Sequence, residues 1–264
     1  MLALRASGAE WLRSAQRAVV VEVIGARGSV PRGCGTRMLV SRSQCEGTIG
    51  GGHLEWRAID EARAMLASGD LTPRTAHYPL GPALGQCCGG AVTLSFSALS
   101  ADALSAWPAG EPRFHLQLYG AGHVGRAIVR ALAPMNVTID WIDEREAEFP
   151  AEVPANTGKR CVDAVEGEVR GAPAGAFYLV LTHQHDLDLR ITEAILRRND
   201  FAFLGLIGSA TKRQRFIHRF EQRGLPASAI ARVTCPIGLP GLTGKEPEVI
   251  AASVVAQMLM WSSA

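Results

Sequence analysis

The chain has 264 residues, of which 47% are hydrophobic and 20% are charged, a composition typical of a globular protein with one large domain or two ordinary ones. Its formal net charge of +2 argues against a nucleic-acid partner, because proteins that bind nucleic acids carry a concentrated basic face. The first residues form no apolar signal segment, and the apolar run over 249–261 is shorter than the about 20 residues that cross a bilayer. We therefore expect a cytoplasmic protein that does not contact a membrane. Its six cysteines are expected to be free thiols that form no structural zinc ribbon, because they show no paired CxxC spacing.

The N-terminal half mixes helical and strand-like patterns. Apolar residues at helical spacing predict helices over 9–17 and 54–67, and β-branched or alternating residues predict strands over 19–24, 38–41 and 91–96. Proline and glycine crowd the stretch after the last of these strands, which is typical of a linker. We therefore predict an N-terminal α+β domain over residues 1–105 and a linker over 106–113.

A loop rich in glycine and arginine separates the first two predicted strands, and it contains Arg27, Arg32 and Arg37. Its backbone N–H groups and planar guanidinium groups suit an anion such as a phosphate. A long turn with solvated arginines explains the composition equally well.

Three further glycines, Gly50, Gly51 and Gly52, precede the helix predicted over 54–67, and His53 stands directly after them. A glycine-rich entry into a helix is a ready anion site, because unpaired N–H groups and the helix dipole point outward. The alternative is that Glu55 only compensates the dipole and that His53 is a surface histidine.

Two adjacent cysteines, Cys87 and Cys88, stand between glycines and follow Gln86. Glycine on both sides allows the backbone to approach a ligand closely, and thiolates are ligands for soft metals. Two alternatives stay open at this point: a pair of small buried residues, or a vicinal disulfide.

The second half begins with a predicted strand over 114–119 followed by the glycine fingerprint Gly120-x-Gly122-x-x-Gly125, with His123 inside it. A helix and a second strand follow, and that strand ends at Asp143. This strand–turn–helix context predicts a Rossmann-like domain with a parallel sheet over residues 114–264, and hence an α/β protein overall. Asp143 is placed to accept a hydrogen bond from a ribose 2′-hydroxyl, and Arg145 keeps a 2′-phosphate open.

Further strands are predicted over 176–182 and 201–207, and each is followed by a helix. Polar residues gather after both strands, where ligands bind in open α/β sheets. The last predicted helix spans 247–261.

The first of these loops contains His183, His185, Asp186 and Asp188. The spacing partly matches the zinc cluster of metallo-β-lactamase-like hydrolases, although Leu187 and Asp188 depart from that pattern. A metal-dependent hydrolase built on His183, His185 and Asp188 is therefore a third-ranked alternative, and we expect Asp186 to cap the following helix instead.

Taken together, these motifs resemble the XdhC/CoxI family, the accessory proteins of xanthine dehydrogenase and related molybdenum hydroxylases. The resemblance covers nearly the whole chain. It rests on the segments Gly28-Ser-Val-Pro-Arg32, Gly35-Thr-Arg-Met38, Gly47-Thr-Ile-Gly-Gly-Gly52, Gly85-Gln-Cys-Cys-Gly-Gly90, Tyr119-Gly-Ala-Gly-His-Val-Gly125, Thr182-His183 with Asp188, Gly205-Leu-Ile-Gly-Ser209 with Lys212, and Cys235-Pro-Ile-Gly238.

The resemblance implies a chaperone and not an enzyme with its own turnover. Such a chaperone binds the molybdenum cofactor (molybdopterin) as cargo, protects it, holds it while a cysteine desulfurase supplies the terminal sulfur, and delivers it to the molybdenum subunit of apo xanthine dehydrogenase or a related hydroxylase. A role in purine metabolism, contact with molybdenum cofactor biosynthesis proteins and a homodimer are further implications. The alternative is an NAD(P)-dependent oxidoreductase that uses the Rossmann-like domain, with NAD(P) as its cofactor and His183 as acid or base.

The expected site follows from these motifs. Cys87 and Cys88 are the expected contacts to the molybdenum of the bound cofactor, with no catalytic residues. The expected cofactor-binding residues are Arg32, Gly50, Gly51, Gly52, His53, Gln86, Cys87, Cys88, Gly120, Gly122, His123, Gly125, Asp143, His183 and Lys212.

Overall fold

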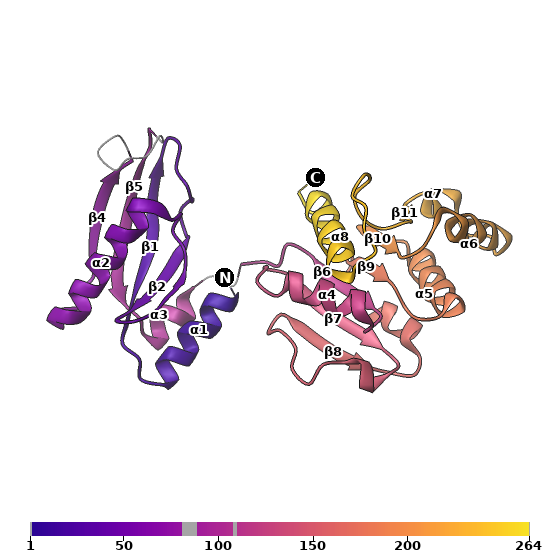
Figure 1. Cartoon of the computed structure of the whole chain (residues 1–264), viewed down its shortest axis with the longest axis horizontal. Coiled ribbons are helices and arrows are strands. Elements are labelled where there is room, and N and C mark those ends of the chain that lie inside the picture. Colours follow the sequence, from indigo (N-terminus) through magenta and orange to yellow (C-terminus); the bar gives the residue numbers. More distant parts are fainter. Residues whose placement is uncertain (1, 81–88, 108–109, 264) are drawn as a thin grey trace. The chain divides into compact units, whose positions relative to one another are not determined.

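The computed structural model describes residues 2–80, 89–107 and 110–263. The chain divides into two compact units, Met1–Ala109 and Gly110–Ala264. Each unit has its own sheet (Figure 1). Each also has its own hydrophobic cores.

The first unit is built on an antiparallel five-stranded sheet with the order β3-β2-β1-β5-β4. Its elements are α1 (Leu2–Arg13), β1 (Ala18–Arg27), β2 (Arg37–Ser41), β3 (Cys45–Gly47), α2 (Gly52–Ser68), β4 (Arg74–Pro79), β5 (Ala91–Ala98) and α3 (Ala101–Ala106). The mixture of helices and an antiparallel sheet is the predicted α+β arrangement.

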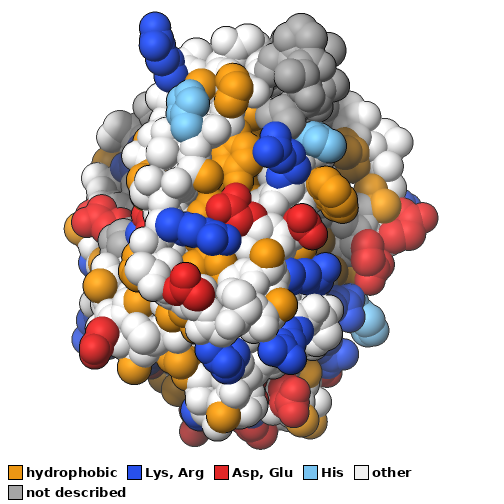
Figure 2. Space-filling view, turned by 90° about the vertical axis from the view of Figure 1, so that its left-hand side faces the viewer, with side chains coloured by type: hydrophobic (Ala, Val, Ile, Leu, Met, Phe, Trp, Pro, Cys, Tyr) orange, Lys and Arg blue, Asp and Glu red, His pale blue; other side chains and the backbone are white. Residues whose placement is uncertain are grey.

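Helices cover both faces of this sheet because β1 is apolar on both sides. Val19, Val21 and Val23 point into the core under α2, whereas Ala18 and Val20 belong to the core beneath α1 and α3. Trp107, which lies in the stretch predicted as a linker, is buried in the second of these cores together with Leu104 of α3. On the face shown in Figure 2, charged side chains of both signs are interspersed among hydrophobic ones.

The second unit is built on a parallel six-stranded sheet with the order β11-β10-β9-β6-β7-β8. Its elements are β6 (His115–Tyr119), α4 (His123–Leu132), β7 (Thr138–Asp143), η2 (Glu146–Glu148), β8 (Thr157–Cys161), η3 (Val165–Gly171), β9 (Phe177–Val180), α5 (His185–Arg198), β10 (Phe203–Leu206), α6 (Ala210–Gln222), α7 (Ala227–Ile230), β11 (Val233–Thr234) and α8 (Pro247–Trp261). This is the doubly wound strand order of a Rossmann fold, so the predicted fold class is confirmed.

The parallel sheet is buried on both faces. Leu116 and Leu118 of β6 face the core that α4 and α8 complete, whereas Tyr119 faces the core that α5, α6 and η3 complete. The α4 and α8 helices pack directly against each other, although more than 100 residues separate them in the chain. Within the described residues, no helix combines the length and apolar character needed to cross a membrane.

Candidate functional site

In the first unit, the glycine-rich motifs meet at one end of the sheet. Gly28, just after β1, lies so close to Gly90, just before β5, that a Cβ on Gly28 would stand 3.1 Å from the Gly90 Cα atom. A Cβ on Gly90 would collide with the carbonyl oxygens of Arg27 and Ser29. Only glycine therefore allows these two backbones to approach each other.

A third loop joins the same end. A Cβ on Gly50 would lie 2.5 Å from the Pro31 side chain, so the loop before α2 packs against the loop after β1. The Leu80 N–H donates to the Gly90 carbonyl at 2.7 Å, so the described residues on either side of 81–88 are held together beside these loops. Gln86, Cys87 and Cys88 themselves lie outside the described residues, and the expectation that the thiols contact molybdenum stays a prediction.

The glycine-rich entry into α2 is filled by a carboxylate. One oxygen of Glu55, Oε2, accepts hydrogen bonds from the Thr48 hydroxyl at 2.5 Å and from the N–H groups of Ile49 and Gly51, both at 3.0 Å. The Gly50 N–H is taken by the Thr48 hydroxyl. An anion at this helix entry would therefore meet the negative charge of Glu55, and the N–H groups of Ile49, Gly50 and Gly51 would not be available to it.

The three arginines of the preceding loop differ in availability. Arg37 is engaged with Glu22, its cross-strand neighbour, through two hydrogen bonds of 2.7 and 3.0 Å, and its side chain is only 10% exposed. Arg37 is therefore not available to bind a phosphate, although its place in the loop had led us to expect this. Arg27 and Arg32 are exposed and form no ion pair with any residue that the structure describes, so they remain the cationic groups of this end of the sheet.

In the second unit, the three glycines of the fingerprint have three different roles. Gly120 has a φ of +122°, as the tight turn after β6 requires. A Cβ on Gly122 would meet no described atom within 4 Å, so the backbone is open to a ligand there. A Cβ on Gly125 would collide with the Gly120 carbonyl oxygen, which shows how closely α4 packs on β6.

A cavity of about 360 Å³ lies beside Gly122. It is lined from the carboxyl ends of four strands by residues Gly122, His123, Val124, Arg145, Glu148, Leu181, Thr182, His183 and Ile207. The strand order reverses between β6 and β9, and ligands of open α/β sheets bind at such a point. We refer to this cavity as the switch-point pocket. It brings together Gly122, His123 and His183 of the predicted site.

Asp143, the predicted ribose acceptor, is buried and already engaged. Its Oδ2 atom accepts from the Ala121 N–H at 2.7 Å and from the Arg145 guanidinium at 2.9 Å, and its Oδ1 atom accepts from the Arg145 backbone and Nε atom at 2.9 Å. Burial raises the pKa of this carboxyl, but the hydrogen bonds from Arg145 and Ala121 outweigh it and hold the pKa below its usual value. Asp143 therefore fixes the glycine loop to the end of β7.

Lys212 belongs to a buried network and does not face solvent as a free cation. Its ammonium group lies 2.5 Å from the Asp188 Oδ2 atom and donates to the Ile207 carbonyl at 2.8 Å. The Asp188 Oδ1 atom accepts from the Thr182 hydroxyl at 2.7 Å and from the Thr182 N–H at 3.0 Å. This network ties the loop after β9 to the loop after β10, and both loops line the switch-point pocket.

The third-ranked metal site is not supported by the geometry. Asp188 is fully buried and paired with Lys212, and His183 faces the Glu144 carboxylate at 3.6 Å. Across residues 2–80, 89–107 and 110–263, no group of three or more His, Cys, Asp or Glu side chains is arranged to hold a metal ion. The expectation that Asp186 caps α5 is also wrong, because Gln184 occupies the N-cap position and Asp186 lies within the first turn.

Two features of these sites were not predicted from the sequence. One is the hydrogen bond from Thr48 to Glu55. A threonine before the glycines and a glutamate after them are the sequence signal that could have indicated it. The other is the pairing of Asp188 with Lys212, for which the motif residues were visible but their contact was not.

Comparison with known proteins agrees with this architecture. A family model of the XdhC Rossmann domain matches residues 116–258, which is more than half of the chain, and a model of the XdhC and CoxI family matches residues 11–79. The chain is 31% identical over 255 residues to the uncharacterized protein YqeB of Escherichia coli K12, an alignment that covers 91% of this chain but only 42% of that relative. The chain thus spans less than half the length of this curated relative.

A solved structure from Bacillus halodurans, described as a xanthine dehydrogenase, superimposes with a TM-score of 0.75 at 19% identity and covers 97% of this chain and 95% of that chain. At this identity the similarity shows the fold. Together with the two family models, it confirms the resemblance that the motifs suggested: the chain belongs to the XdhC and CoxI family.

Proposed function

We propose that this protein acts in the maturation of xanthine dehydrogenase or a related molybdenum hydroxylase, as a cytoplasmic accessory protein without its own turnover. In this proposal it binds the molybdenum cofactor as cargo, protects it during sulfuration by a cysteine desulfurase, and delivers it to the apo-enzyme. Family membership supports the coarse role. The finer steps, the homodimer and contact with cofactor biosynthesis proteins are part of the proposal.

One observation carries the proposal: the motif loops of the first unit converge. Gly28 packs on Gly90 and Gly50 packs on Pro31, so loops that are far apart in the sequence share one end of the sheet with the anchors of the cysteine segment. The molybdenum cofactor combines a soft, oxygen-sensitive metal centre with a terminal phosphate, so its site needs a soft ligand and a cationic group. Arg32 is an exposed cation on the same loop as Pro31.

The proposal is tested by cofactor binding and transfer. The purified protein is mixed under nitrogen with molybdenum cofactor released from a molybdoenzyme, and bound molybdenum and pterin are measured after gel filtration. We expect both to co-elute in equal amounts and the loaded protein to activate apo xanthine dehydrogenase. The absence of co-elution would refute the cargo role.

Single substitutions then locate the site. Cys87→Ala or Cys88→Ala should lower the bound molybdenum, whereas Cys161→Ala, which removes an exposed thiol at the end of β8, should not. Arg32→Ala should weaken pterin binding, with Arg17→Ala as the control for loss of an exposed arginine. If neither cysteine variant differs from Cys161→Ala, the thiols are not metal contacts.

A second candidate function is an NAD(P)-dependent oxidoreductase, and the switch-point pocket is the observation that favours it. Titration with NADH and NADPH, followed by fluorescence, tests this candidate. The engagement of Asp143 by Arg145 weighs against a ribose 2′-hydroxyl at that carboxylate. Saturable binding together with turnover of a carbonyl substrate would replace the chaperone proposal.

A further inference from the structure

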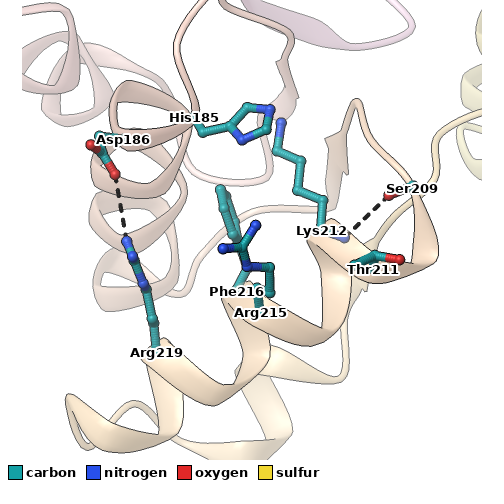
Figure 3. A pocket seen from close by; sticks show the side chains of 8 residues that line it. All are labelled: His185, Asp186, Ser209, Thr211, Lys212, Arg215, Phe216 and Arg219. Carbon is teal, nitrogen blue, oxygen red and sulfur yellow. Dashed lines mark hydrogen bonds and ion pairs between the residues drawn. The ribbon is translucent and has the colours of Figure 1, made fainter.

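A second cavity of the Rossmann domain, separate from the switch-point pocket, lies between the first turns of α5 and α6 and measures about 250 Å³. It is lined by His185, Asp186, Ser209, Thr211, Lys212, Arg215, Phe216 and Arg219. Figure 3 shows Lys212, Phe216 and Arg219 of α6 pointing toward the start of α5. We refer to this cavity as the α5–α6 pocket.

The helical repeat explains why the cationic residues gather on one side. Lys212, Arg215, Phe216 and Arg219 are spaced at three- and four-residue intervals, so they form one stripe along α6. The Phe216 ring is buried and forms the floor, while the two guanidinium groups remain exposed at the rim.

The charges of the pocket do not cancel. Lys212 is neutralised by the buried Asp188, and Arg219 faces Asp186 at 3.5 Å with both side chains at least half exposed, where an ion pair contributes little. Arg215 forms no ion pair or side-chain hydrogen bond with any residue of the described part of the chain. A positive charge therefore remains that no described carboxylate balances.

The start of α6 adds neutral donors to this positive field. The Ser209 hydroxyl accepts from the Lys212 N–H at 3.2 Å and thereby caps the helix. The N–H groups of Ala210 and Thr211 precede the first intrahelical hydrogen bonds, and the Thr211 hydroxyl stands beside them. An oxyanion in the cavity would lie beside Thr211 at the start of the helix and beside the Arg215 guanidinium.

The contrast with the switch-point pocket shows which cavity suits an anion. The switch-point pocket is lined by one arginine and one glutamate, and Asp143 already holds that arginine. The α5–α6 pocket is lined by three cationic side chains and one carboxylate, and because Asp188 holds Lys212 and Asp186 faces Arg219, Arg215 is the cation that stays unpaired among the described residues. The glycine fingerprint therefore faces the switch-point pocket, which is the less favourable of the two cavities for an anion. The α5–α6 pocket is the more favourable one.

We propose that the α5–α6 pocket binds the phosphate group of a small molecule, with Arg215 as the principal cationic contact. This proposal does not depend on the cargo proposed above, because it rests on the second unit alone. Its ligand is either inorganic phosphate or an organic phosphomonoester, and the experiment separates the two.

The full-length protein is titrated with inorganic phosphate and with ribose 5-phosphate, each followed by calorimetry and by the amide resonances of residues 209–212. We expect saturable binding with shifts confined to these amides, and tighter binding of ribose 5-phosphate if the ligand is an organic phosphomonoester. Sulfate should compete, and added sodium chloride should weaken binding. The absence of any saturable shift with both probes would overturn the proposal.

Three variants are expected to change the phosphate affinity in three different ways. Arg215→Ala should weaken phosphate binding by about tenfold or more, because one charge-assisted hydrogen-bond pair is lost. Asp186→Asn should strengthen it, because a carboxylate leaves the rim. Arg213→Ala removes the same charge from the same helix outside the pocket lining, and it should leave the affinity within about twofold.

An equal loss in Arg213→Ala and Arg215→Ala would show a diffuse charge effect and would refute a built site. Thermal unfolding of each variant confirms that it is folded. A failure of molybdenum cofactor binding in the earlier experiment, with phosphate binding intact, would refute the cargo and leave this site standing.

Discussion

The buried pair formed by Asp188 and Lys212 allows a quantitative test of how the second unit is held together. In Lys212→Met the aliphatic stem is kept but the ammonium is removed, so the fully buried Asp188 carboxylate loses its counter-ion. Breaking a buried pair in this way costs about 3–5 kcal/mol. For a unit of this size, each kcal/mol lowers the melting temperature by about 2–4 °C, so we expect a decrease of about 6–20 °C.

The assay is differential scanning calorimetry of the full-length protein. Hydrogen exchange of peptides from β9 to α6 assigns the shifted transition to the second unit. The matched control is Lys159→Met, whose lysine pairs with Glu146 on the surface and whose loss should leave the melting temperature nearly unchanged.

A double variant separates the pair from its surroundings. Asp188→Asn combined with Lys212→Met should be more stable than the sum of the single losses predicts, by about 1–3 kcal/mol, because the uncompensated charge disappears. If Lys212→Met unfolds within a few degrees of Lys159→Met, or if the two losses are additive, the argument for a stabilising buried pair is wrong.

Three further predictions concern the glycine loops and the carboxylates that hold them. Glu55→Ala should lower the free energy of unfolding by about 2–4 kcal/mol, because one carboxylate accepts from three donors there. It should also raise the rate of hydrogen exchange over residues 48–54, and an unchanged rate would contradict this role. Gly50→Ala should be about 1–3 kcal/mol less stable than Gly51→Ala by urea unfolding, because both have positive φ but only a Cβ at Gly50 meets a neighbouring side chain. For Asp143, whose folded-state pKa is lowered chiefly by Arg145 against the effect of burial, the stabilisation is present above the unfolded-state pKa of about 3.9 and is lost as the pH falls through the lower folded-state value. The melting temperature of Asp143→Asn should therefore decrease less on acidification than that of the unchanged protein, and parallel decreases would argue against this linkage.

The elements predicted correctly from the sequence are those whose burial repeats with a regular period. The alternation of β5 and the continuous apolar run of β9 each identify a strand. β4 and β8 were missed, because both are edge strands rich in exposed polar residues and are held by pairing with one neighbour only. The helix predicted over 9–17 spans Leu2–Arg13, so its start and its end were both placed too late, because Ser7 and Gly8, which favour helices poorly, interrupt its first half.

The candidate sites were predicted less completely because availability depends on tertiary partners. Arg37 was expected to be free for an anion, but the strand register places it opposite Glu22, and the register is not readable from composition. The N–H groups before α2 were expected to be open, but Glu55 folds back onto them. The space around each glycine likewise depends on its tertiary neighbours. Gly122 is open to a ligand, whereas Gly125 packs against the Gly120 carbonyl.

The packing of α8 on α4 has a consequence for how the protein folds during its synthesis. Ala127 and Ile128 of α4 share their core with Val254 and Met258 of α8, so the helix that carries the glycine fingerprint is covered by a segment made more than 100 residues later. Until that segment is available, the apolar outer face of α4 has no cover, and the nascent second unit is an exposed target for chaperones and proteases. The first unit has cores of its own, so we expect it to fold while the ribosome is still translating the second.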